Sequence, residues 1–238
     1  MNSARADRVG ERLLRRAQRL DNAFGLVLVL VVSSLVLGSL LPNQGWAAIV
    51  ISVAVGAASI AALTGSHARQ ALVRSALWLS LAAIALAFIA AVSGGRFWLN
   101  ACALIQVVLL TGAMLAVLYR VLTSTEIGTR TILGAISVYA LLGILFAYIY
   151  GAVDLIQGGP FFTEVAHPGG SDFLFFSYST LTTTGFGNLV PGGQPGRMFA
   201  GLEMMAGQIV LVTLIAGLIR LWRPGEAMRR RLAGRTQG

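Results

Sequence analysis

Six apolar runs, each about long enough to cross a lipid bilayer, are the feature that most limits how this chain can fold. A helix rises about 1.5 Å per residue, so roughly 20 apolar residues cover the hydrocarbon core of a membrane. The runs are Ala23–Leu41, Trp46–Leu63, Leu72–Val92, Phe97–Tyr119, Thr131–Gly151 and Met198–Trp222. The sequence therefore predicts an all-α membrane protein with six transmembrane helices, since helices satisfy their own backbone hydrogen bonds in lipid.

The composition agrees with a membrane protein and argues against most soluble classes. Charged residues make up 11% of the 238-residue chain, against about 25% in soluble domains. All 18 basic residues are arginine and the net charge is +9, but the arginines cluster at the ends of the apolar runs. That placement argues against nucleic-acid binding. The sequence contains no phosphate loop, nucleophile constellation or zinc spacing, so nothing in it points to an enzyme or a cofactor.

The arginines also assign an orientation. Of the 18, only Arg96 and Arg197 fall on one side of the predicted membrane. Cytoplasmic loops carry the excess of arginine, so we expect a multi-pass protein with both termini cytoplasmic. The short chain without an appended domain favours a plasma membrane, specifically a bacterial inner membrane. The basic segments 1–22 and 223–238 are expected to touch anionic lipid, the first either as an amphipathic helix or as a basic tail.

The segment between the last two runs is polar and glycine-spaced. Residues 182–188 read Thr-Thr-Thr-Gly-Phe-Gly-Asn. Gly185 and Gly187 allow positive φ at alternate positions. Successive backbone carbonyls can then point the same way, into a lumen, and replace the water shell of a cation. The pattern therefore predicts a cation-binding loop of the kind that ion channels use.

A short helix is expected immediately before this loop. Residues 172–182 are rich in aromatic side chains but too few to span a bilayer, and Ser171 or Asp172 can cap the first turn. Such a half-helix is tolerated at membrane depth only where protein or water surrounds it. Its C-terminal end would direct a partial negative charge at a cation. Residues 152–171, rich in glycine and proline, are expected to form an extracellular turret.

Together with Pro191, the Gly196-Arg197 pair and the spacing to Gly207, residues 182–188 resemble the pore module of the potassium channel family. The close similarity covers residues 131–222, with a pore helix at 172–182 and a selectivity filter at 183–188. Residues 23–122 are similar only in layout, to a four-helix sensor domain. The resemblance implies a homotetramer around one pore, with potassium bound by backbone carbonyls alone. These carbonyls belong to Thr183, Thr184, Gly185, Phe186 and Gly187.

Three residues depart from the family's usual filter. Thr184 replaces valine and adds a hydroxyl that needs a partner, Phe186 replaces tyrosine, and Asn188 replaces aspartate at the outer mouth. The Phe-Gly-Asn ending is similar to that of the ether-à-go-go branch, so potassium selectivity is the leading interpretation. A nonselective cation channel of the same fold is the alternative. A cation transporter subunit is a further one, but it would require an internal repeat, which we do not find.

Six-span potassium channels often carry a ladder of arginines on the fourth span, and this chain has none before Arg120. Steep gating needs several charges, since one charge crossing the field yields about 2.3 kcal/mol per 100 mV. We therefore expect weak or absent voltage gating. The candidate gating residues are Gly207, as a hinge or a close-packing site, and Glu203, the only acid inside a predicted span. For Glu203 the alternatives are structural bracing and pH sensing.

Overall fold

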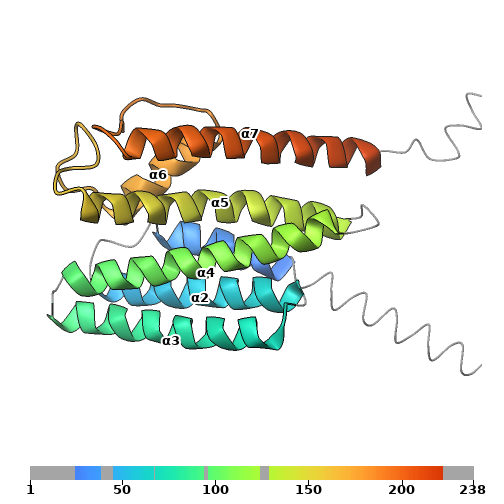
Figure 1. Ribbon diagram of the computed structural model, residues 1–238, viewed down its shortest axis with the longest axis horizontal. Helices are drawn as coiled ribbons and strands as arrows, with labels where there is room; N and C mark the ends of the chain where they lie inside the picture. Colours follow the sequence, from blue (N-terminus) through green and yellow to red (C-terminus); the bar gives the residue numbers. More distant parts are fainter. Residues whose placement is uncertain (1–24, 39–44, 67, 94–95, 124–128, 222–238) are drawn as a thin grey trace, which may run out of the picture.

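The computed structural model describes residues 25–38, 45–66, 68–93, 96–123 and 129–221. Its labelled helices are α2 (Gly45–Gly65), α3 (Gln70–Ser93), α4 (Arg96–Leu122), α5 (Thr129–Ile156), α6 (Gly170–Leu181) and α7 (Gly196–Leu221) (Figure 1). A further apolar helix, Gly25–Gly38, precedes them. Within the described ranges the only strand-like feature is one isolated bridge, so this part of the chain has the predicted all-α class.

Five of the described helices are long and apolar enough to cross a membrane. The crossing stretches are Trp46–Gly65, Gln70–Ser93, Phe97–Leu122, Thr131–Ile156 and Gly196–Ala216. They correspond to the second through sixth predicted runs. The first predicted run, Ala23–Leu41, is represented by the shorter helix Gly25–Gly38, and its ends lie outside the described residues. A sixth span therefore stays a prediction, and the basic segments 1–22 and 223–238 lie outside the described residues.

Helix α5 joins two groups of helices (Figure 1). On one side α5 packs against α4, which contacts α2 and α3; on the other side it packs against α6 and α7. Among the labelled helices, α5 is the only one that contacts both groups. Val27 and Val31 of the helix Gly25–Gly38 complete a core shared with α2, α4 and α5. The short helix α6 is thus held between α5 and α7.

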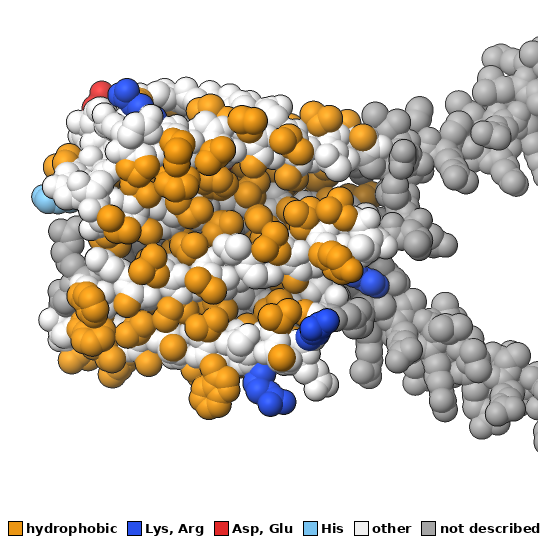
Figure 2. All heavy atoms as spheres, in the orientation of Figure 1, with side chains coloured by type: hydrophobic (Ala, Val, Ile, Leu, Met, Phe, Trp, Pro, Cys, Tyr) orange, Lys and Arg blue, Asp and Glu red, His pale blue; other side chains and the backbone are white. Residues whose placement is uncertain are grey.

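Helix α3 packs through small side chains and presents large ones outward. Its buried residues are Ala76, Ser80, Ala83, Ala87 and Ala90. Small residues let helix backbones approach closely in a membrane. Trp78 and Phe88 on the same helix are exposed. Apolar side chains spread over the visible face of the whole molecule, and the basic side chains in this view lie toward its ends, as expected for a surface that meets lipid (Figure 2).

Helix α4 carries its charges only at its ends. Arg96 is its first residue and Arg120 lies in its last turn. Gln106, near the middle, is completely buried, and its amide group has no hydrogen-bond partner among the described residues. Because its charged residues lie only at its two ends, α4 offers no row of charges that could move through a membrane field.

The helix ends near α6 differ from those predicted. Helix α5 continues to Ile156, past the predicted end at Gly151, because residues 152–156 contain no glycine or proline that would break it. Asp154 therefore also lies on a helix long and apolar enough to cross a membrane, near its C-terminal end, where Oδ1 accepts the Phe161 N–H at 3.0 Å. Glu203 is thus not the only acid on such a helix. Helix α6 begins at Gly170 and α7 at Gly196, each slightly before the predicted start.

Candidate functional site

Helix α6 ends where the 183–188 loop begins, and local hydrogen bonds hold both of its ends. At the start, Asp172 Oδ2 accepts the Gly169 N–H at 2.8 Å. At the end, Thr182 is the C-cap and its N–H donates to the Tyr178 carbonyl at 3.0 Å. The carbonyl end of α6, which carries the partial negative charge of the helix dipole, therefore meets the loop.

The N–H groups of the 183–188 loop turn back toward α6. Thr184 and Gly185 both donate to the Ser179 carbonyl, at 2.9 and 3.2 Å, and the Phe186 N–H donates to Ser179 Oγ at 3.3 Å. Within the described residues, no hydrogen bond is accepted by the backbone carbonyls of residues 183–187. Residues 182–188 are exposed in the single chain. The loop therefore keeps a row of carbonyl oxygens available as ligands.

The backbone of the loop alternates in handedness. The angle φ is 57° at Thr183, 60° at Gly185 and 79° at Gly187, whereas Thr184 and Phe186 between them have negative φ. Alternation of this kind allows successive carbonyls to face one direction. The sequence pattern predicted positive φ at the two glycines but not at Thr183, because a β-branched residue adopts this region rarely.

The added hydroxyl of Thr184 has its partner inside the same turn. It lies 2.8 Å from Thr182 Oγ1, whose own proton is directed to the Tyr178 carbonyl at 2.6 Å. Since a threonine hydroxyl has a single proton, Thr184 is the donor of the pair. The Thr183 hydroxyl donates to the Thr182 carbonyl at 2.7 Å. The threonine side chains thus brace the start of the loop without engaging the carbonyls of residues 183–187.

Phe186 is held by an aromatic contact instead of a hydroxyl. Its ring stacks on Phe175 of α6, with centroids 5.3 Å apart and 24° between the ring planes. Aromatic pairs of this kind contribute about 0.5–1.5 kcal/mol beyond the area they bury. Phe186 is still 67% exposed, and Asn188 is exposed as well. The C-terminal end of the loop is therefore not covered by other residues of the same chain.

The segment after the loop is hydrogen-bonded to residues 157–169, which connect α5 to α6, and to the start of α7. The Gly192 N–H donates to the Phe161 carbonyl at 2.8 Å, and Arg197 Nε donates to the Pro191 carbonyl at 3.1 Å. A Cβ at Gly196 would lie 2.8 Å from the Phe161 ring. The Gly196-Arg197 pair therefore acts structurally: glycine admits the ring, and arginine ties down the returning chain.

A cluster of aromatic rings fills the space between α5, α6 and the segment 157–169 that connects them. Its buried rings are Phe146, Tyr150, Phe161, Phe162, Phe173 and Phe176. Most of them meet edge to face, as Tyr150 and Phe176 do with centroids 5.0 Å apart and 62° between planes. This geometry is the favourable one for aromatic pairs. The cluster fixes the N-terminal half of α6 against α5.

Two tyrosine hydroxyls join α6 to α5 nearer the loop. Tyr178 donates to the Ala140 carbonyl at 2.5 Å, and Tyr139 donates to the Leu181 carbonyl at 3.1 Å. The Tyr178 ring lies so close to Gly143 that a Cβ there would come within 2.6 Å of it. Sequence reasoning identified none of these residues, because a lone tyrosine or glycine in an apolar run gives no indication of its partner.

The two gating candidates on α7 both face α6. Glu203 is completely buried, and its carboxyl group contacts Tyr150 of α5 and Ser177 of α6. Gly207, one turn later, packs against the end of α6, since a Cβ there would lie 2.7 Å from the Leu181 carbonyl oxygen. Helix α7 is continuous through both positions. The geometry therefore gives Gly207 a close-packing role, and its use as a hinge stays a prediction.

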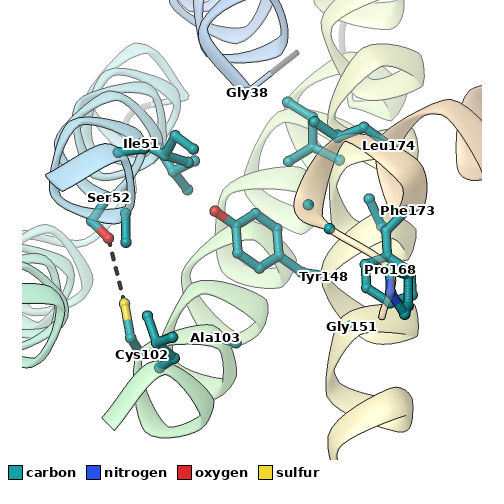
Figure 3. A pocket seen from close by; sticks show the side chains of 18 of the residues that line it. Gly38, Ile51, Ser52, Cys102, Ala103, Tyr148, Gly151, Pro168, Phe173 and Leu174 are labelled. Carbon is teal, nitrogen blue, oxygen red and sulfur yellow. Dashed lines mark hydrogen bonds between the residues drawn. The ribbon is translucent and has the colours of Figure 1, made fainter. Parts of the chain in front are cut away.

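A cavity of about 530 Å³ lies beside the N-terminal half of α6, and no residue of the 183–188 loop lines it (Figure 3). Apolar side chains such as Ile51 and Leu174 line most of it, and the Tyr148 hydroxyl points into it. Ser52 and Cys102 lie at one edge, with Oγ and Sγ 3.4 Å apart. No residue of the loop lines this cavity, so it is separate from the row of carbonyls.

Metal ligands of other kinds do not gather in the described part of the chain. None of its histidine, cysteine, aspartate and glutamate side chains form a group of three or more that could hold a metal ion. The cation ligands that this site offers are the loop carbonyls.

Residues 139–223, which contain most of α5, all of α6 and the loop, and α7, match the family model described as an ion channel. This part of the chain is therefore similar to an ion-channel domain, and the likeness to the potassium channel family noted in the sequence falls on the same residues. Comparison with curated proteins gives no match. The match supports an ion channel, and the apolar helices indicate a membrane protein.

Replacing Gly207 with alanine is expected to destabilise the protein by about 1–3 kcal/mol, as overpacking does elsewhere. The new methyl group would meet the Leu181 carbonyl at 2.7 Å and push α7 away from α6. The free energy of unfolding in detergent measures the effect. Gly201→Ala is the matched control, because it lies on the same helix with no atom within 4 Å of its Cβ position. Equal losses for the two variants would contradict the packing role.

Proposed function

We propose that this ion-channel domain forms a potassium-selective pore, in which four identical chains place their 183–188 loops around one axis. The observation that carries the proposal is the loop backbone. The N–H groups of residues 183–186 are bonded to α6, whereas the carbonyls of residues 183–187 have no donor among the described residues. A cation on the axis would take those carbonyls in place of its water shell. One chain contributes a quarter of each ring of oxygens, so the site requires neighbours.

The surroundings of the loop support an assembly of several chains. Irregular polar backbone is not tolerated against lipid and occurs at membrane depth only inside protein or beside water. Residues 182–188 are nevertheless exposed in the single chain. Only 17% of the spanning window of α7 is buried, against 50% for that of α5. Neighbouring copies would cover both the loop and the exposed side of α7.

Potassium is the ion that the residues favour. The loop resembles the potassium channel filter over residues 182–188, and the carbonyl end of α6 meets it. The departures at Thr184 and Phe186 are accommodated locally, by the Thr182 hydroxyl and the Phe175 ring. A nonselective cation pore on the same fold is the second candidate, because stacking holds the Phe186 ring on one face without a hydroxyl bond.

The same proposal places the protein in a plasma membrane with both termini cytoplasmic. Arg120 ends α4 at the expected inner side, and Arg197 lies beyond the loop at the expected outer side. The basic segments 1–22 and 223–238 are proposed to contact anionic lipid, since arginine near such a surface contributes about 1 kcal/mol per residue.

The reversal potential of the purified protein in planar bilayers tests the permeant ion. With potassium on one side and sodium on the other, we expect a reversal potential close to the potassium equilibrium value. The reason is that rigid rings of carbonyls replace the hydration of one cation better than that of another. A reversal potential near zero, with measurable current, would contradict selectivity and favour the nonselective pore.

Replacing Gly185 with alanine should abolish potassium current. Its φ of 60° is a conformation that costs an L-residue about 1–2 kcal/mol, and the loop would relax by turning a carbonyl away from the axis. Single-channel recording or potassium flux from vesicles measures the loss. Gly193→Ala is the matched control, since this nearby exposed glycine has neither a positive φ nor an atom within 4 Å of its Cβ position. The proposal fails if both variants conduct normally.

Open probability should change little with membrane voltage. Steep dependence requires several charges that move in the field, and α4 has none between Arg96 and Arg120. Recordings over a wide range of voltages, at symmetrical potassium, measure this directly. A steep sigmoidal activation curve would show that charges elsewhere move and would contradict the expectation.

A further inference from the structure

Three short oxygen–oxygen contacts meet around the Glu203 carboxyl group. Tyr150 Oη lies 2.5 Å from Oε2, and Ser177 Oγ lies 2.5 Å from Oε1. The same Ser177 oxygen lies 2.7 Å from the Gly143 carbonyl oxygen. Glu203, Tyr150 and Ser177 are all 0% exposed, so bulk water has no access to this group of atoms.

Each of these contacts needs one proton between its two oxygens. Tyr150 and Ser177 carry one hydroxyl proton each, and the Gly143 carbonyl is only an acceptor. If Glu203 were ionised, two protons would have to serve three contacts, and one pair of oxygens would face each other without a proton. A protonated Glu203 supplies the missing one. Glu203 then donates to Ser177, Ser177 donates to Gly143, and Tyr150 donates to the other carboxyl oxygen.

We infer that Glu203 is held as a neutral carboxylic acid, and that its proton completes a hydrogen-bond chain that runs from α7 through α6 to α5. Glu203 is a positioning residue in this arrangement, since it touches neither the 183–188 loop nor the ion. The positioning role of Glu203 rests on the proposed channel function. The inference that Glu203 holds a proton does not depend on that function.

The surroundings of Glu203 offer no positive charge that would stabilise a carboxylate. The titratable side chains that face it are Tyr139 and Tyr150 from α5 and Tyr178 from α6. Arg197, on its own helix, is directed to the Pro191 carbonyl. Among the described residues no cationic group faces the carboxyl. An isolated buried charge is costly in a protein interior, and a hydrogen-bonded neutral acid avoids that cost.

The chain of hydrogen bonds acts close to the loop. Ser177 lies two residues before Ser179, which accepts the N–H groups of the loop, and one turn before Leu181, which accepts the Tyr139 hydroxyl. Loss of the proton would draw the Ser177 hydroxyl from Gly143 to Glu203 and release one link between α6 and α5. The folded state holds this proton, whereas an exposed carboxyl group in the unfolded chain releases it. The free energy of unfolding therefore falls as the pH rises.

Infrared spectroscopy tests the bound proton directly. Purified wild-type protein in an ester-free detergent is expected to show the C=O stretch of a protonated carboxyl group at neutral pH. The band should be missing from Glu203→Gln and should decline in the wild type at high pH. A wild-type spectrum with no difference from Glu203→Gln in this region would overturn the inference, whether or not the protein conducts potassium.

Variants test the positioning role. In Glu203→Gln the side-chain amide donates to Ser177 and its carbonyl accepts from Tyr150. The potassium current and the thermal midpoint of this variant are therefore expected to match those of the wild type at neutral pH. At high pH the midpoint of the wild type should decline, whereas that of the variant should not. Glu203→Leu should lose current and lower the midpoint by several degrees. Failure of Glu203→Gln to fold, or a loss equal to that of Glu203→Leu, would contradict a neutral acid. A nonselective current in all variants would refute the proposed function and leave the inference standing.

Discussion

Polar backbone inside a membrane has to be satisfied by protein, by water or by an ion, and the contacts around the 183–188 loop bear on that constraint. The N–H groups of Thr184, Gly185 and Phe186 donate to Ser179, and the carbonyls of residues 183–187 have no donor in the described chain. Positive φ at three alternate positions, beginning at Thr183, makes this division of donors and acceptors geometrically possible. The N–H groups of residues 183–186 are therefore satisfied by α6, and the proposed pore would satisfy the carbonyls with a cation held between neighbouring chains.

A loop of this kind keeps its shape only if α6 is rigid, and the structure holds α6 from two sides. Aromatic rings and the Tyr139 and Tyr178 hydroxyls fix it to α5. Glu203 and the close approach at Gly207 fix it to α7. Of the labelled helices, only α5 also contacts the N-terminal group, and the helix Gly25–Gly38 reaches α6 at Leu174. A movement of α2, α3 or α4 would therefore reach the loop through these two helices.

The sequence was informative where the determining forces are local. Apolar length predicted the five described helices that are long and apolar enough to cross a membrane, and the spacing of Gly185 and Gly187 predicted their positive φ. The end of α5 was misplaced because polar Asp154 does not stop a helix. The contacts that hold α6 could not be predicted, since Tyr139 meets a carbonyl 42 residues away and Ser177 meets Glu203 26 residues away. A lone polar residue in an apolar run does not disclose its partner.

The proposed pore requires that the carbonyls of residues 183–187 surround an ion. The most direct measurement is an experimental structure of the purified protein in potassium, repeated in sodium. We expect a fourfold assembly with the loop carbonyls facing the axis and ion density between successive rings in potassium. A monomer, or an assembly in which the 183–188 loops lie away from any shared axis, would contradict the account.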